Sequence, residues 1–397
     1  MRSRSLRTGL LVAAITVLLG VGLAEAAVRR LQPVPETELL PFPFHPLAVE
    51  RLDAGDSYLR FDPDLGWSQR PGARAVDDGI VYQANGGGFR SDREYSPEPP
   101  PGVRRLAAFG DSFTHCDEVS LQDCWTARLE ATWERSEVLN FGIQASAPDQ
   151  GWLRYQRDGR PYRPCAVLIG FQVENVNRVV NRYRPFYAPQ SGVAFSKPRF
   201  VLEGDGLRLL PNPASGSGQL DDPAWVEREL GPNDFWYFSG MFAPRPLDSL
   251  MLARLGRSAL YRQHRSTIEG SKSDERPNGN AYTPEDERFR VSGRLLVQFA
   301  SEVRADGATP VVLFFGQRDE VVSVRHRQPK EYQPLLDWLA AEQIPTVDVT
   351  DDLAREANRV GADTLFARNG HYSRRGNQAV SVALAQRLPR LTAPTCG

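Results

Sequence analysis

The sequence predicts an α/β fold, a doubly wound sheet of mainly parallel strands with helices on both faces. Three observations support this prediction. Short apolar runs of strand length alternate with amphipathic segments of helix length from residue 103 onward. The apolar runs are nearly continuous, as expected for strands buried on both faces. Polar residues able to carry chemistry follow several runs directly, at the sheet edge where such folds bind ligands.

Five strands and five main helices are expected in alternating order. The expected strands span residues 103–110, 137–144, 165–173, 309–316 and 345–350. The expected helices span residues 121–134, 148–159, 286–307, 332–343 and 376–388. Strands joined through helices of this length pair in parallel, because the connection must cross over one face of the sheet.

The alternation breaks between about residues 181 and 285, which we interpret as an insertion within a single domain at 102–395. One helix, at 246–265, is expected in this insertion. Its aromatic run at 233–242 either lines a substrate cleft or forms the insertion's own small core, since clustered aromatic rings commonly bury one another. Residues 30–101 are rich in proline, glycine and polar side chains and indicate a linker followed by a short β-rich lead-in.

Residues 1–29 carry a signal for export or membrane anchoring. Three arginines precede an uncharged apolar stretch at 8–24. A spanning helix needs roughly 20 apolar residues, so this stretch fits both a membrane anchor and a long signal-peptide core. The tripeptide Ala-Glu-Ala at 24–26 offers a cleavage pattern, whereas Arg29 and Arg30 suit an interfacial anchor. We expect a retained anchor with the main domain outside the cytoplasm, periplasmic or at the cell surface, and a secreted protein if the segment is cleaved.

Composition excludes some classes of partner. The formal net charge is −1, with 48 Lys and Arg against 49 Asp and Glu. A nucleic-acid binder needs an excess of basic side chains to neutralise phosphates, so nucleic acid is not an expected partner. The sequence has no Cys or His spacing typical of a metal site, no phosphate-binding glycine loop and no dinucleotide fingerprint. We therefore expect no metal and no cofactor.

The stretch Gly110-Asp111-Ser112, after the first expected strand and at a helix start, presents a small hydroxyl at the sheet edge. A serine hydroxyl becomes a nucleophile when a base, most often a histidine, accepts its proton. Among five histidines, His371 lies in a glycine-flanked loop before the last helix, from where it can reach this edge. His115 is three residues after Ser112 but faces another direction on the first turn. Asp111 is expected to be structural and to bond the amides of the turn.

Acyl transfer also needs hydrogen-bond donors aimed at the oxyanion of its tetrahedral intermediate. The backbone N–H of Ser112, at a helix start, and that of Gly142, after the second strand, are candidates. An amide side chain from the segment 169–178, at the end of the third strand, would complete the set.

Cys116 and Cys124 are close enough in sequence to close a short loop beside Ser112 with a disulfide. An exported chain reaches an oxidising compartment in which such a bond persists. Two separate buried thiols are the alternative, since pairing cannot be derived from sequence alone.

These motifs resemble those of the SGNH, or GDSL-type, serine hydrolases, and the apolar N-terminal helix resembles their membrane-anchored bacterial branch. GDSFT at 110–114 is similar to the first family block, Gly142 to the glycine of the second, and HYSRRGN from His371 to the last. The resemblance implies a three-layer αβα sandwich with a flavodoxin-like, five-stranded sheet. It also implies Ser112 as nucleophile, His371 as base, and the N–H groups of Ser112 and Gly142 as oxyanion donors.

Two departures from the family pattern bear on the site. The third block normally reads Gly-x-Asn-Asp, but FQVEN follows Gly170 here, so Asn175 is the candidate amide donor and Gln172 the alternative. Family members also carry an aspartate two or three residues before the histidine, and this chain has none there. His371 is then oriented by Asn369, by a backbone carbonyl or by an aspartate from elsewhere.

The expected activity is that of a serine esterase cleaving a carboxylic ester through an acyl-serine intermediate. The resemblance implies small O-acyl groups on an envelope glycan, or a lipid ester, as substrate. Two alternatives stay open: an O-acyltransferase of cell-envelope polysaccharide, and a non-catalytic carbohydrate-binding protein on the same fold. The missing aspartate favours the last, and the presence of both Ser112 and His371 speaks against it.

Overall fold

The computed structural model describes residues 2–31, 34–43, 55, 57–189, 194–270, 272 and 278–392. The expected end of the domain at residue 395 lies outside these ranges, as do parts of the expected linker and insertion.

A five-stranded sheet forms the centre of the molecule. Its strands are β5 (Arg104–Phe109), β6 (Ser136–Asn140), β7 (Ala166–Gln172), β10 (Thr309–Phe315) and β11 (Thr346–Asp348). They lie in the order β11-β10-β7-β5-β6, and every pair in this sheet is parallel. Numbered along the chain, this order is 2-1-3-4-5, which confirms the doubly wound, flavodoxin-like class that the sequence predicts.

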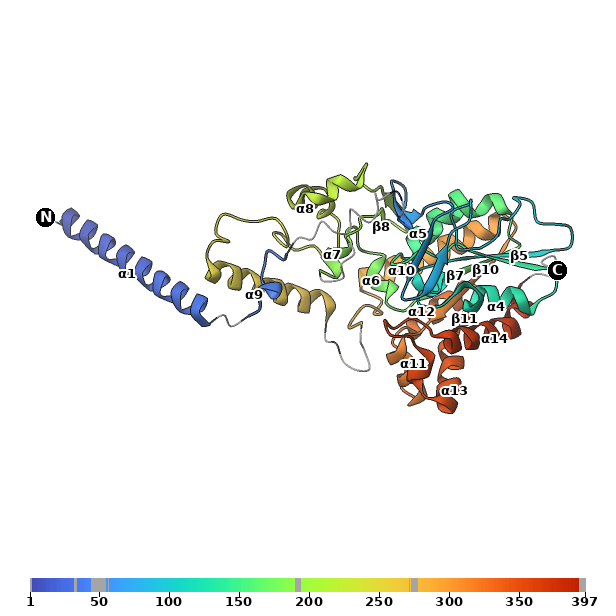
Figure 1. Ribbon diagram of the computed structural model, residues 1–397. Helices are drawn as coiled ribbons and strands as arrows, with labels where there is room; N and C mark the ends of the chain where they lie inside the picture. The colour runs from blue at the N-terminus through green and yellow to red at the C-terminus, as the bar shows by residue number, and fades with distance from the viewer. Residues whose placement is uncertain are drawn as a thin grey trace.

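Helices cover both faces of the sheet and give three layers (Figure 1). One face carries α4 (Trp125–Thr132), α11 (Arg318–Arg325), α13 (Thr350–Val360) and α14 (Arg374–Leu391). The other face carries α5 (Pro148–Arg154), α10 (Glu287–Ala305) and α12 (Gln333–Ala341). The alternation of side chains along each strand divides the core between the two layers, since Leu106 and Ala108 join the first cluster and Ala107 and Phe109 the second.

The lead-in segment folds as part of this domain. It forms two hairpins, β1 (Leu59–Asp62) with β2 (Gly66–Gln69) and β3 (Arg74–Asp77) with β4 (Ile80–Gln83). Trp67 and Phe89 are almost fully buried in the core clusters. The described part of the lead-in therefore supplies core side chains and is more than a connection.

The insertion contains more regular structure than the single helix expected. It holds α7 (Arg184–Tyr187), the hairpin of β8 (Arg199–Glu203) and β9 (Gly206–Leu210), α8 (Pro223–Leu230) and α9 (Met251–Glu269), and the short helix α6 (Asn175–Arg178) lies just before it. Its aromatic run lies in a third core cluster, in which Trp236, Met241 and Phe242 are buried. This cluster also contains Trp67 of the lead-in, so the run packs into a core that the insertion shares with the rest of the domain.

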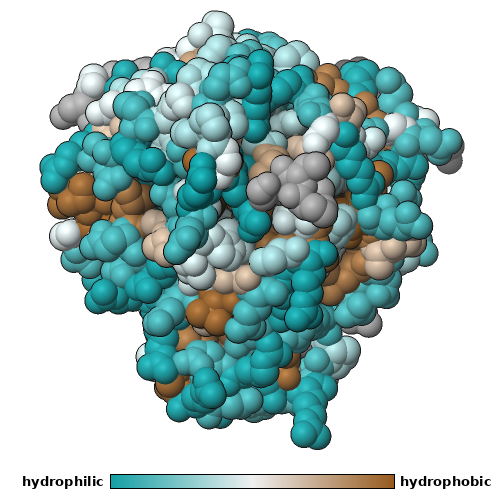
Figure 2. All heavy atoms as spheres, turned by 90° about the vertical axis from the view of Figure 1, so that its right-hand side faces the viewer, coloured by the Kyte–Doolittle hydropathy of each residue, from teal (hydrophilic) through white to brown (hydrophobic). Residues whose placement is uncertain are grey.

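The helix α1 (Arg2–Leu31) extends away from the rest of the molecule and ends beside α9 (Figure 1). Its part from Gly9 to Leu31 has a mean hydropathy of 2.2 and is long and apolar enough to cross a membrane; a signal sequence shares these properties. The face of the molecule at the opposite end is mostly hydrophilic, with scattered hydrophobic patches (Figure 2).

Candidate active site

Ser112 begins the short helix α3 (Ser112–His115), which follows β5 after a sharp turn. Asp111 caps this helix, because its Oδ1 accepts a hydrogen bond of 2.9 Å from the N–H of Phe113. A Cβ at Gly110 would lie 2.3 Å from the Oγ1 of Thr114, so only glycine fits between the strand and the helix. The turn therefore fixes Ser112 at the carboxyl end of the sheet.

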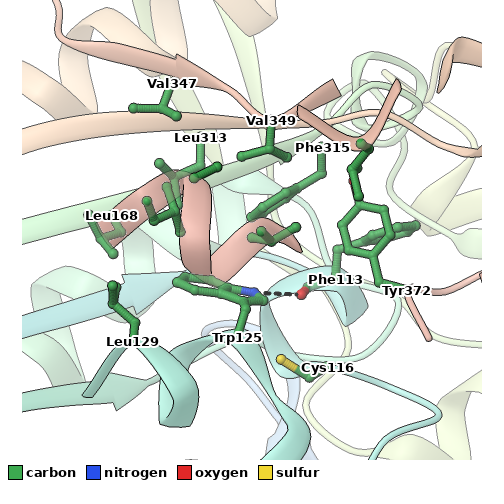
Figure 3. Close-up of a cluster of buried hydrophobic side chains, with 14 of the residues drawn as sticks. Phe113, Cys116, Trp125, Leu129, Leu168, Leu313, Phe315, Val347, Val349 and Tyr372 are labelled. Atoms are coloured by element: carbon green, nitrogen blue, oxygen red, sulfur yellow. Dashed lines mark hydrogen bonds between the residues drawn. The ribbon is translucent and has the colours of Figure 1, made fainter. Parts of the chain in front are cut away.

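His371 reaches Ser112 from the loop before α14. Its Nε2 lies 2.9 Å from the Oγ of Ser112. The neighbours of both residues are anchored in one core, since the rings of Phe113 and Tyr372 meet edge to face with centroids 4.8 Å apart. Figure 3 shows these rings beside Trp125, whose Nε1 donates to the carbonyl of Phe113. Packing below the site thus sets the position of the serine and of the histidine.

The carboxylate that orients His371 belongs to Glu118, which the sequence analysis did not identify. Its Oε2 lies 2.9 Å from the Nδ1 of His371, and its Oε1 accepts a 2.8 Å hydrogen bond from the N–H of Asn369. Asn369 was one of three expected candidates for orienting the histidine, beside a backbone carbonyl and an aspartate from elsewhere, and it is the backbone of Asn369 that binds Glu118. An acidic residue in the loop directly after the serine helix was the one available signal in the sequence.

The loop that carries Glu118 is held on several sides. A disulfide joins Cys116 to Cys124, and both Cys116 and Glu118 have left-handed backbone angles, with φ of 64° and 66°. The guanidinium of Arg90, itself buried, donates to the carbonyls of His115, Cys116 and Val119. The hydroxyl of Tyr82 accepts a 2.8 Å hydrogen bond from the N–H of Glu118. These contacts offset the cost of a left-handed conformation in residues other than glycine.

His115 takes no part in the contact with Ser112. It is fully buried, its Nε2 lies 2.9 Å from the hydroxyl of Tyr58, and its Nδ1 lies 2.5 Å from Oδ1 of Asp117. Burial lowers the pKa of His115 to about 4, so the imidazole is neutral near pH 7 and donates to the carboxylate. Burial acts to raise the pKa of Asp117, but the contact with His115, including its hydrogen bond, and the charge of Arg90 together outweigh burial, and the pKa is lowered.

Gly142 lies outside the cleft beside Ser112. Its N–H donates a 3.0 Å hydrogen bond to the Oδ1 of Asn140, and a Cβ there would lie 2.3 Å from the amide nitrogen of His115. The glycine is needed for this close approach of two backbones, and its N–H is already used. The expected donor role for Gly142 is therefore not compatible with this geometry.

The same turn brings Gln144 and Ala145 to the cleft instead. Ala145 has a left-handed backbone, with φ of 59°, a conformation more typical of glycine. Within the described residues, neither Gln144 nor Ala145 donates its N–H to a hydrogen bond, and the same holds for the N–H of Ser112. These amides are free to bind a ligand oxygen.

Neither candidate amide side chain lines the cleft. Asn175 is fully buried and its Nδ2 donates a 3.1 Å hydrogen bond to Oδ2 of Asp111. Gln172 is also buried; its Oε1 accepts from the N–H of Glu174, and its Nε2 has no acceptor within the described part of the chain. Burial raises the pKa of Asp111, although the nearby Arg178 and the bound amides oppose this effect. The contacts of Asn175 and Asp111 thus stabilise the turn below the serine.

A cleft of about 750 Å³ opens over Ser112 and His371. It is lined by the two residues and by Phe113, Asp117, Gln144, Ala145, Arg178, Arg184, Gln317, Arg318, Asp319, Asn369 and Gly370. Within the described residues, no group of three or more His, Cys, Asp and Glu side chains is placed to hold a metal ion. The cleft thus brings together a hydroxyl, an imidazole, carboxylates, guanidinium groups and backbone amides.

Three solved structures illustrate what the chain is similar to. A lipolytic protein of the G-D-S-L family from Veillonella parvula is 14% identical, with 72% of this chain and 99% of that chain covered and a TM-score of 0.34. A lipase/acylhydrolase from Enterococcus faecalis is 13% identical, with 74% and 98% covered and a TM-score of 0.35. An acetyl xylan esterase from Geobacillus stearothermophilus is 11% identical, with 71% and 93% covered and a TM-score of 0.37.

No family model matches the chain, and no curated protein matches its sequence.

Proposed function

We propose that this chain is a serine esterase of the SGNH type that hydrolyses a carboxylic ester through an acyl-serine intermediate. The observation that supports this proposal is the chain of contacts from Ser112 through His371 to Glu118, with 2.9 Å at each step, at the floor of an open cleft. A serine, a histidine in hydrogen-bond range and a carboxylate behind it are the three groups that activate a hydroxyl.

In the proposed reaction, the Oγ of Ser112 bonds to the ester carbonyl carbon while the Nε2 of His371 accepts its proton. The carbonyl oxygen becomes an oxyanion, and the N–H groups of Ser112 and Ala145 are the proposed donors to it. The C–O bond to the alcohol breaks, and the alcohol leaves with the proton from His371. Water then attacks the acyl-serine by the same route, which releases the acid and restores the serine.

Glu118 has a defined part in this scheme. Its carboxylate holds the proton of His371 on Nδ1, so that Nε2 faces Ser112 as a base, and it stabilises the imidazolium that forms. The absence of an aspartate near His371 favoured a non-catalytic carbohydrate-binding protein on the same fold. Because Glu118 offers the carboxylate from another loop, that argument loses its support.

For the substrate we retain O-acyl groups of an envelope glycan or a lipid ester.

Labelling of the full chain in detergent with a fluorophosphonate probe tests the proposal. The wild type is expected to be labelled, and Ser112→Ala and His371→Ala are expected to lose the label, since the probe reacts only with an activated serine. Ser215→Ala, at an exposed loop serine, serves as the matched control and should label like the wild type. A folded wild type without label would refute the esterase proposal.

We further propose that α1 is retained as a single membrane anchor and that the catalytic domain lies outside the cytoplasm. The carboxylate of Glu25 accepts hydrogen bonds from the N–H groups of Met251 and Leu252, at 2.8 and 3.0 Å, and so caps the start of α9. Arg29 donates to the carbonyl of Ser249. Cleavage within the tripeptide at 24–26 would remove or sever this cap. The disulfide supports a location in an oxidising compartment.

Mass spectrometry of the N-terminus of protein isolated from membranes tests the anchor. Peptides from residues 9–24 should be present in the mature protein, and alkaline carbonate should not extract it. A mature chain that begins after residue 26 would contradict the proposal.

A further inference from the structure

Arg184 is a cation in the cleft that forms no ion pair with a carboxylate of the described residues. It begins α7 and lines the cleft together with Ser112 and His371. Within the described residues its guanidinium makes no hydrogen bond and no ion pair, and its Nε is buried without an acceptor. Its guanidinium carbon lies 5.3 Å from the centroid of the Tyr187 ring, a cation–π contact.

The other two arginines that line the cleft are engaged. Arg178 pairs with Glu174, lies 3.5 Å from Oδ2 of Asp111 and donates to the carbonyl of Ser146. Arg318 pairs with Asp363 at 2.6 Å. A buried or half-buried guanidinium normally has carboxylate or carbonyl partners, because its five donors are costly to leave unpaired.

Glu174 attracts Arg184 electrostatically, but the two form no hydrogen bond or ion pair. Glu174 pairs with Arg178 and accepts a 2.7 Å hydrogen bond from the hydroxyl of Tyr187. Burial, and then the like charge of Arg178, lower the pKa of Arg184 to about 10, so the side chain is still charged near pH 7. An anion bound beside Arg184 would offset both the burial of its charge and the repulsion from Arg178.

We propose that Arg184 binds an anionic group, a carboxylate or a phosphate, on the ester that this site cleaves. The inference rests on the proposed esterase function and adds the substrate class to it: acidic esters are preferred over neutral ones of the same size. The planar guanidinium matches both kinds of anion with two parallel hydrogen bonds, which a lysine cannot reproduce. Arg184 thus acts as a binding residue for the substrate, and the reacting bonds are left to Ser112 and His371.

The first experiment compares two esters with four-carbon acyl groups, 4-nitrophenyl butyrate and 4-nitrophenyl hemisuccinate, which differ in the terminal carboxylate. The wild type should prefer the hemisuccinate in kcat/KM by at least about tenfold, the range expected for a charge-assisted hydrogen bond. Arg184→Gln should abolish this preference mainly through KM, and Arg184→Lys should keep part of it. Arg359→Gln, which changes an exposed arginine outside the cleft, should keep the preference of the wild type.

The second experiment measures binding without catalysis and separates the two proposals. Calorimetry with succinate and with inorganic phosphate is done on the full-length Ser112→Ala variant and on the same variant with Arg184→Gln. Binding that disappears with Arg184→Gln supports the anion site even if no ester is hydrolysed, and the anion that binds identifies the class. No binding of either anion, together with an unchanged ester preference in Arg184→Gln, would overturn the inference. An equal loss of kcat/KM for both esters in Arg184→Gln would assign Arg184 a structural role and would also overturn the inference.

Discussion

Two histidine–carboxylate pairs meet at one loop, since their carboxylates, Asp117 and Glu118, are neighbours in sequence, and the two histidines differ in access. Asp117 lines the cleft, but its partner His115 is closed off, with a fully buried side chain and both ring nitrogens bonded to protein groups. His371 with Glu118 is open, with 22% of the histidine side chain exposed and Nε2 directed at a hydroxyl in the cleft. A histidine beside a carboxylate is therefore not by itself a base for catalysis; its second nitrogen must face a group that can react.

The difference also shows in the pKa of the buried member. Burial lowers the pKa of His115 far below its usual range, so the imidazole stays neutral. This residue contributes to the fold through its hydrogen bonds with Tyr58 and Asp117. His371 instead has to gain and lose a proton in each proposed cycle, and its partly exposed position permits this. The comparison predicts that substitutions in the two pairs separate activity from stability.

The largest effect is expected from His371→Ala. It should lower kcat for 4-nitrophenyl acetate by at least about 10³-fold, because the general base is lost, and leave Tm nearly unchanged. His115→Gln should do the opposite, with a lower Tm and a kcat within about tenfold of the wild type, since a buried pair loses its partner. Equal losses of kcat in the two folded variants would remove the distinction between the pairs.

A second, smaller loss of activity is expected from Glu118→Gln. A neutral amide cannot stabilise the imidazolium and admits the wrong tautomer of His371, which costs on the order of 10² to 10⁴-fold in kcat. Glu356→Gln, on the far side of α13, changes a carboxylate that pairs with Arg375 and should retain the wild-type kcat. Full activity of Glu118→Gln in steady-state kinetics would mean that another group orients the histidine.

The third prediction concerns acid stability. The pKa of His115 is about 4 in the folded chain and about 6.5 when unfolded, so the unfolded state binds more protons between these values. The free energy of unfolding should therefore fall as the pH drops from 6.5 towards 4, by roughly 3 kcal/mol from this group at most. Urea unfolding at pH 7 and pH 4.5 should show a smaller fall for His115→Gln than for the wild type. His326→Gln, at an exposed histidine, should match the wild type at both values.

The smallest effect is expected from Tyr82→Phe. It removes the acceptor for the N–H of Glu118 but leaves the ring in place, at a cost of about 1 kcal/mol. If the lost hydrogen bond displaces the carboxylate of Glu118, kcat should fall by no more than about fivefold. A change in Tm without a change in kcat would show that the other contacts of the loop suffice to hold the carboxylate.

Much of the fold could be predicted because its signals are local. Each of the five strands was expected where it is observed. A short, continuous apolar run between two helices indicates a strand that is buried on both faces of a sheet. Ser112 and His371 were also found from local context, a turn after the first strand and a loop before the last helix. The small helices and the hairpin of the insertion were missed, because short elements with mixed polarity have weak periodicity.

The rest of the site depends on tertiary contacts that no local pattern encodes. Glu118 lies 253 positions from His371 in sequence, and it reaches the histidine through a left-handed backbone. Gly142 was expected to donate to the oxyanion because glycine lets a substrate approach the backbone closely. In the structure, the group that approaches Gly142 closely is the backbone of His115. Ala145 has a left-handed backbone conformation, which sequence patterns lead one to expect at glycine.

The separation of Ser112 and His371 along the chain also has a consequence for biosynthesis. The serine follows the first strand of the sheet, whereas the histidine precedes α14, the last helix described. A ribosome therefore completes the hydroxyl, its helix and the loop of Glu118 while the base has not yet been made. A chain that stops before residue 371 carries a serine without its proposed base, so interrupted synthesis leaves an inert hydroxyl and no unregulated nucleophile.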